Sequence, residues 1–222
     1  RFTLSDGEGT PNGVFVGERK GSVNVAYYPY ENIKGVGDGI LNVYLPFVQE
    51  WREGTFAQGA YPMMGVSSSD VMDFKNLCSV LKVSLKGNDP VNSIIFRSAS
   101  EDVKVAGNAT VATGFSSVPC LEMTSDAVSE VSLMCNGIAL NETVATDFYI
   151  VLPAQTYTGG FTLEIVGPSG VMTKTADGDI VMERSQLRAI PEFVYEPEAL
   201  VEPSDEFEGE GTQQSPFLIN NV

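Results

Sequence analysis

The chain has 222 residues, 43% of them hydrophobic and 9% aromatic, and its 29 acidic and 13 basic side chains give a formal net charge of −16. A chain of this length and apolar content builds one large or two small hydrophobic cores. The excess of negative charge repels nucleic acid and anionic lipid, so neither is expected as a partner.

Histidine is absent from the sequence. Its absence removes the usual general base near neutral pH, the commonest zinc ligand and every catalytic arrangement built on Ser-His or Cys-His pairs. The three cysteines, Cys78, Cys120 and Cys135, are too far apart for a metal or redox motif. They are expected as small buried thiols, with a bridge between Cys120 and Cys135 as the alternative. We therefore predict no enzyme, no catalytic residue, no metal and no cofactor.

Short alternating segments recur along the chain, separated by Gly, Pro, Asn, Asp and Ser, a spacing typical of β-sandwiches and barrels. The first third predicts strands at 13–17, 22–28 and 40–45, with a turn at 35–39. Segment 74–80 lacks alternation and predicts a short helical turn. Leu81, Val83 and Leu85 then alternate with polar residues, which predicts a strand buried on one face. The remaining predicted strands are 93–97, 109–113, 131–135, 148–152, 161–166, 171–175, 180–183 and 191–195.

The insert "PAQTYTGG" separates the strands predicted at 148–152 and 161–166. Pro153 has no N–H to donate and ends the first strand, and Gly159 and Gly160 permit the positive φ values of a turn. The insert is therefore interpreted as a connection, with Tyr157 kept as a candidate for ligand contact. A second connection, "GPSG" at 167–170, predicts a tight hairpin.

Three further kinds of site are conceivable from the residues alone: calcium, glycosidase and sugar-binding sites. Asp177 and Asp179 in "ADGDI" supply too few carboxylates for calcium, and "DG" is a common turn. A glycosidase needs only two carboxylates, but nothing singles out a pair. Three aromatic residues, Tyr30, Trp51 and Tyr157, are candidates for sugar contact, and core packing is the alternative for each.

The C-terminal segment 197–222 is strongly acidic and contains neither Lys nor Arg. Such charge runs usually form solvated linkers. It ends in "SPFLINNV", where Phe217, Leu218 and Ile219 form a strand-like apolar run. We predict that this run pairs with a sheet edge of the same or another chain; the alternative is that it opens a further module.

Several ordered segments together resemble the fimbrillin-like, type V pilin-like family of surface proteins from anaerobic oral and gut bacteria. They are "FKNLCSVLKVSLKG", "VNSIIFRS", "DFYIVLPAQTYTGGFTLEIVGPSGVMTKT" and "VMERSQLRAIPEF", with "YYPY" and "FAQGAYPMMG" in the earlier half. The resemblance implies two tandem Greek-key β-sandwich domains of transthyretin-like topology with few or no helices. It also implies export, display at the outer membrane through a lipid anchor that this chain lacks, and assembly in which a neighbouring subunit's strand fills a groove.

Together these observations predict an N-terminal sandwich domain at 1–70, short for the family, a C-terminal sandwich domain at 71–196 and the acidic segment at 197–222. The predicted function is that of a non-enzymatic fimbrial subunit or adhesin at the cell surface. Its expected partners are other fimbrial subunits, or host or bacterial surface ligands, glycans among them. The alternative is a carbohydrate-binding surface module of a larger multidomain lipoprotein.

Overall fold

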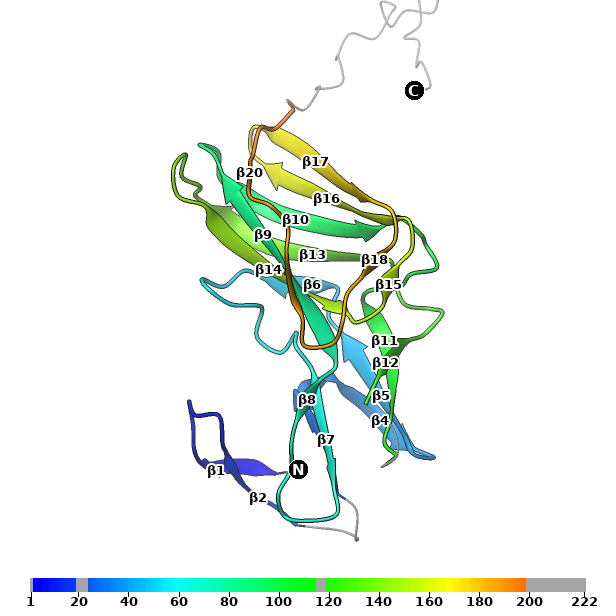
Figure 1. The fold of residues 1–222 in the computed structure, drawn as a ribbon. Coiled ribbons are helices and arrows are strands. Elements are labelled where there is room, and N and C mark those ends of the chain that lie inside the picture. Colours follow the sequence, from blue (N-terminus) through cyan, green and yellow to red (C-terminus); the bar gives the residue numbers. More distant parts are fainter. Residues whose placement is uncertain (1, 19–23, 115–118, 199–222) are drawn as a thin grey trace, which may run out of the picture.

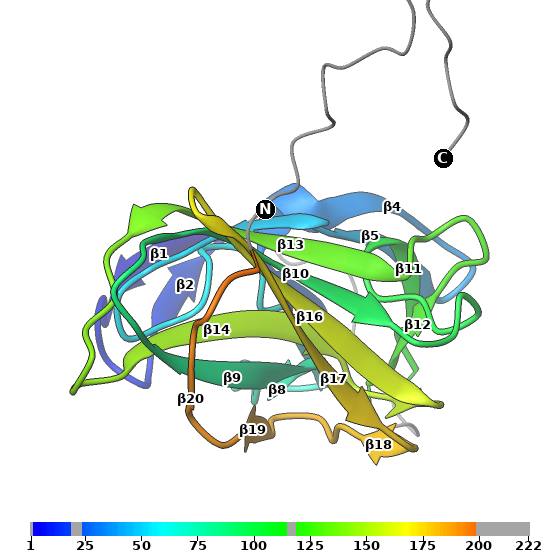
Figure 2. The same ribbon diagram turned by 90° about the horizontal axis from the view of Figure 1, so that it is seen from above.

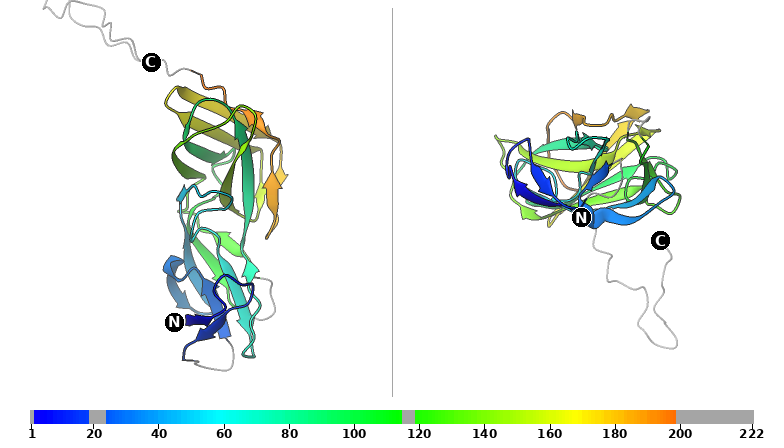
Figure 3. Two further views of the ribbon diagram at one scale, coloured as in Figure 1. Left: turned by 90° about the vertical axis from the view of Figure 1, so that its left-hand side faces the viewer. Right: turned by 90° about the horizontal axis from the view of Figure 1, so that it is seen from below.

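The computed structural model describes residues 2–18, 24–114 and 119–198. This part of the chain is all-β: it holds no α-helix, and only a 3-10 turn, η1 (Tyr30–Asn32), interrupts the strands. The all-β prediction is therefore confirmed. The strands gather into two units stacked end to end, with the N-terminal strands at one end and β17 and β20 at the other (Figure 1; Figure 3, left).

The larger unit is a sandwich of two sheets that cross over one another (Figure 2). One sheet has the order β17 (Gly170–Asp177), β16 (Gly160–Gly167), β10 (Val91–Ser98), β13 (Glu130–Ile138) and β6 (Val48–Glu50). The other sheet has the order β14 (Thr146–Pro153), β9 (Cys78–Lys86) and β19 (Leu187–Ala189), and β20 (Phe193–Val194) also pairs with β9. A two-stranded ribbon, β15 (Thr156–Tyr157) with β18 (Ile180–Val181), closes one side.

The core of the larger unit follows from the period of two in its strands. Leu81, Val83 and Leu85 of β9 are fully buried, as their alternation predicts. They belong to one apolar cluster with Ile94 and Leu163 of the facing sheet. The two sheets are therefore held together by interdigitating side chains from their inner faces.

The smaller unit also has two sheets. Its four-stranded sheet has the order β12 (Leu121–Met123), β11 (Gly107–Ala112), β5 (Ile40–Leu45) and β4 (Ile33–Gly37). Its three-stranded sheet has the order β3 (Asn24–Tyr28), β7 (Met63–Ser67) and β8 (Lys75–Asn76). A separate hairpin, β1 (Thr3–Asp6) with β2 (Val14–Val16), lies beside this unit (Figure 1).

Two long strands join the units. Val80 of β9 lies opposite Val151 of β14, and both belong to the core of the smaller unit. Their neighbours Leu81 and Ile150 are also paired, and both belong to the core of the larger unit. Because successive side chains of a strand point to opposite faces, β9 and β14 bury both faces where the units meet.

Two local predictions are wrong. Segment 74–80 is not helical: it contains β8 and the start of β9, and burial on both faces is what removes the alternation from Cys78–Leu81. The turn predicted at 35–39 is shorter, because Gly35 to Gly37 belong to β4 and only Asp38 and Gly39 turn, both with positive φ. The "GPSG" hairpin is confirmed, since Gly167 pairs with Gly170.

The domain boundary predicted at residue 70 stays a prediction, and strand pairing crosses it three times. β6 pairs with β13 of the larger unit. β7 pairs with β8, and β5 pairs with β11 over its whole length. Residues 107–123 therefore contribute two strands to the smaller unit, although they follow β9 and β10 in the chain. The predicted Greek-key, transthyretin-like topology of two tandem domains also stays a prediction.

Candidate functional site

One edge of the larger sandwich is closed by side chains. Gln49 of β6 is only 3% exposed, and its amide donates a hydrogen bond to the carbonyl of Val151 (2.8 Å) and accepts one from its N–H (2.9 Å). β14 is the end strand of its sheet, so these backbone groups lie on the side that no strand pairs. The Gln49 amide takes the place of a neighbouring strand at this point.

Trp51 covers the next part of the same β14 edge. Its indole N–H donates to the carbonyl of Asp147 (3.1 Å), and its ring lies against Phe148 with 6.3 Å between centroids. The side chain is partly buried and packs on the core of the larger unit. Of the two interpretations of Trp51, the structure shows packing.

Tyr157 lies inside the core. Its side chain has no exposed surface, its ring meets Phe96 edge-on, and its hydroxyl donates to the carbonyl of Pro153 (2.9 Å). No ligand reaches it there, so its candidacy for sugar contact is replaced by the core-packing alternative. Gly159 and Gly160 both have positive φ, and β15 pairs with β18. The insert at 153–160 is a connection.

The other candidate residues lie apart from this region. Tyr30, 59% exposed, belongs to η1 next to the smaller unit's four-stranded sheet, so it shares no platform with the buried Tyr157. Phe217, Leu218 and Ile219 lie outside the described residues. Asp179, weighed for calcium, accepts a hydrogen bond from the N–H of Gly159 instead.

Other polar sites are sparse in the described chain. Residues 2–18, 24–114 and 119–198 contain no group of three or more side chains placed to hold a metal ion. In those same ranges no helix is long and apolar enough to span a membrane. All three cysteines are free; Cys78 and Cys135 are buried and Cys120 is exposed, so the alternative bridge is not formed. Burial raises the pKa of the Cys135 thiol to about 12, which leaves it unreactive.

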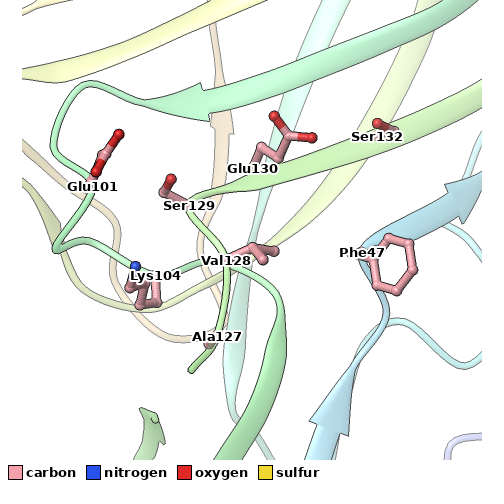
Figure 4. Close-up of a pocket in the computed structure, with 8 residues that line it drawn as sticks. All are labelled: Phe47, Glu101, Lys104, Ala127, Val128, Ser129, Glu130 and Ser132. Carbon is pink, nitrogen blue, oxygen red and sulfur yellow. The ribbon is translucent and has the colours of Figure 1, made fainter. Parts of the chain in front are cut away.

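A shallow cleft of about 470 Å³ opens on the larger unit beside β13 (Figure 4). Phe47 stands at one end, and Glu101 and Lys104, from the loop between β10 and β11, stand at the other. Ala127, Val128, Ser129, Glu130 and Ser132 line the cleft between them. Sequence reasoning did not single out any of these residues, because they come from three separate segments and none belongs to a motif.

At the smaller unit, end strands expose apolar side chains. β4 is the end strand of its sheet, and Val36 within it is 73% exposed. The hairpin of β1 and β2 exposes Leu4, Phe15 and Val16 in the same way. These edges contrast with the closed edge of β14.

The comparisons with known proteins bear on the fold. No protein-family model matches the sequence, and no curated protein matches it. The structure is similar to that of a putative cell adhesion protein from Bacteroides uniformis, with a TM-score of 0.55 and 15% identity over 87% of this chain and 78% of the other. A putative cell adhesion protein from Bacteroides ovatus matches with a TM-score of 0.45 and 16% identity, over 78% of this chain and 66% of the other. At this identity the likeness to the first protein shows a shared all-β fold.

Proposed function

We propose that the protein is a non-enzymatic cell-surface protein, a fimbrial subunit or adhesin, that assembles by β-strand addition. Two tandem sandwich domains of transthyretin-like topology, and export to the outer membrane through a lipid anchor, are part of this proposal. The likeness in fold to a putative adhesion protein of Bacteroides uniformis supports the adhesin assignment, and the lack of histidine supports a non-enzymatic role.

The observation that carries the proposal is the difference between two sheet edges. Proteins normally protect an end strand, because its free N–H and C=O groups invite pairing with another chain. The β14 edge is protected in this way by Gln49 and Trp51. Among the described residues no strand pairs with the outer side of β4, which exposes the apolar Val36 and has a register shift between Ile33 and Gly35. Lys34 also belongs to β4. Its ammonium nitrogen lies over the ring of Tyr44 on the neighbouring strand β5, 5.0 Å from the ring centroid.

The strand that pairs with β4 is proposed to be Phe217, Leu218 and Ile219 of another copy. An extended strand adds to an open edge through backbone hydrogen bonds, and its alternate side chains select the register. β4 belongs to one unit of the elongated fold, whereas β17 and β20, next to which the described chain ends, lie at the far end of the other (Figure 3, left). A contact between different ends of two copies is heterologous and extends into a filament.

The test uses the full chain, followed by light scattering and negative-stain electron microscopy over a range of concentrations. We expect the wild type to form linear assemblies, and both Leu218→Lys and Val36→Lys to stay monomeric because a charge at the paired edge is costly. Val181→Lys, at an exposed position of β18 in the other unit, is the matched control and should assemble. A wild type that stays monomeric, or a Leu218→Lys variant that assembles normally, would overturn the proposal.

A carbohydrate-binding surface module is the second candidate function. The cleft beside Phe47 favours it, because an exposed aromatic ring and several polar side chains line the same open depression.

A further inference from the structure

We propose that the cleft between Phe47 and Lys104 binds a neutral sugar ring at the end of a glycan. The inference rests on the proposed role as an adhesin, for which it names the class of ligand. Three features of the cleft support it. It has an aromatic face, several of its polar side chains are without partners in the described part of the chain, and it holds more carboxylates than cations.

The aromatic face is provided by Phe47. Its side chain is 54% exposed and lies outside both cores, in the short connection between β5 and β6. Tyr44 meets it edge-on with 6.5 Å between the ring centroids, which holds the Phe47 ring in place. A fixed, exposed aromatic ring offers a large apolar surface at little entropic cost. The C–H face of a pyranose ring is a flat apolar surface of matching kind.

The polar side chains of the cleft are available for a ligand. In the described part of the chain, the hydroxyls of Ser129 and Ser132 have no hydrogen-bond partner, and Glu101 and Lys104 have no ion-pair partner. Hydroxyl, carboxylate and ammonium groups together supply both donors and acceptors. A sugar hydroxyl, which donates and accepts at once, can use all of them.

An ion pair with Arg97 holds Glu130 in position. Arg97 of the neighbouring strand forms an ion pair with Glu130, and its other terminal nitrogen lies 3.2 Å from Glu164. A guanidinium between two carboxylates restricts the rotamers of both. One oxygen of Glu130 faces Arg97, and the other remains free to accept a hydrogen bond from a ligand.

Backbone groups of the cleft floor are already paired, which disfavours a peptide strand as the ligand. The N–H of Val128 donates to Ala106 (2.8 Å), and its carbonyl accepts from Val105 (2.7 Å). The carbonyl of Ser129 accepts from the N–H of Ser98 (2.9 Å). Strand addition needs free backbone groups, whereas the free groups here belong to side chains.

The charge and the volume of the cleft restrict the class of ligand further. Two carboxylates, Glu101 and Glu130, and one cation, Lys104, line the cleft. The chain as a whole has a formal net charge of −16. Acidic sugars are therefore repelled, and a neutral ring is favoured. A volume of about 470 Å³ is in the range of small-ligand sites, and its open shape suits the terminal residue of a chain that continues into solvent.

Saturation-transfer NMR on the full chain tests the proposal, with methyl β-galactoside, methyl α-mannoside and N-acetylglucosamine as neutral probes and N-acetylneuraminic acid as the acidic probe. We expect transfer to at least one neutral probe and none to the acidic one. Phe47→Ala should weaken binding of that probe by about tenfold, the loss of one good aromatic contact, whereas Phe47→Trp should retain it. Phe15→Ala is the matched control, since Phe15 is an exposed phenylalanine of similar exposure (52%) on β2, and it should bind as the wild type does.

The proposal is overturned if no neutral probe receives saturation, or if Phe47→Ala and Phe15→Ala bind alike. Transfer to the acidic probe alone, or binding of an unrelated extended peptide that Phe47→Ala abolishes, would also overturn it. These measurements do not depend on assembly: a chain that forms filaments but binds no sugar contradicts only the cleft, and one that binds sugar but stays monomeric contradicts only strand addition.

Discussion

Gln49 and Val151, 102 positions apart in the chain, are joined by two hydrogen bonds that close the free edge of β14. We expect Gln49→Met to lower the free energy of unfolding by about 2–3 kcal/mol, because the buried N–H and C=O of Val151 lose their partners. Urea denaturation measures the change. Gln58→Met, at an exposed glutamine, is the matched control and should lie within about 0.5 kcal/mol of the wild type. Equal stabilities of the two variants would contradict the closure.

Tyr157 is a core residue with a hydrogen-bonded hydroxyl, and the two parts of its side chain are separable by mutation. Tyr157→Phe should cost about 1 kcal/mol through loss of the bond to Pro153. Tyr157→Ala should cost about 3–5 kcal/mol, because it also leaves a cavity next to Phe96. Thermal unfolding of both variants checks the order. A surface role would instead leave both variants as stable as the wild type.

Gly159 and Gly160 have similar φ values, +76° and +89°, but different surroundings. A Cβ at Gly160 would lie 1.8 Å from the backbone oxygen of Ala176, whereas a Cβ at Gly159 would meet Ala99 at an ordinary 3.5 Å. Gly159→Ala should therefore cost only about 1–2 kcal/mol, for the left-handed conformation. Gly160→Ala should cost clearly more, because strand β17 has to move. Chemical denaturation of the pair is the measurement, and equal losses would show that conformation alone matters.

Asp147 carries an acid-sensitive contribution to stability. Burial alone would raise the pKa of its carboxyl, but hydrogen bonds from Lys82 (2.7 Å) and Ser84 (2.7 Å) outweigh burial and hold the pKa below its ordinary value of 3.8. A carboxyl with a lowered folded-state pKa stabilises the fold above its unfolded-state pKa, and the contribution is lost as the pH falls through the folded-state pKa. Because the pair is partly exposed, it is worth only about 0.5–1 kcal/mol.

We therefore expect Asp147→Asn to be less stable than the wild type at pH 7, and the difference to shrink as the pH falls below about 4. Unfolding by urea at several pH values gives the profile. Asp102→Asn, at an exposed aspartate without an ion-pair partner in the described ranges, should show no such change. A difference for Asp147→Asn that stays constant down to pH 2 would contradict the assignment.

The strands with one buried face were predictable from the sequence. The strand expected at 40–45 is β5, and those expected at 161–166 and 171–175 lie within β16 and β17. Alternation is a local property, since each side chain of such a strand meets either the core or water. Where β9 enters the junction of the two units, both faces are buried and the local signal is lost.

The sequence alone predicted the all-β fold that the described residues have, excluded histidine chemistry and favoured a connection for the insert at 153–160, because these depend on composition, on alternation and on the backbone limits of Pro and Gly. Only the tertiary structure decided that Tyr157 is buried, that Gln49 closes β14 while no described strand covers the outer side of β4, and that Phe47 lines one cleft with Glu101 and Lys104. Each of these relationships joins residues far apart in the chain. Their proximity depends on which strands pair, and strand pairing is set by the packing of the whole fold rather than by any local segment.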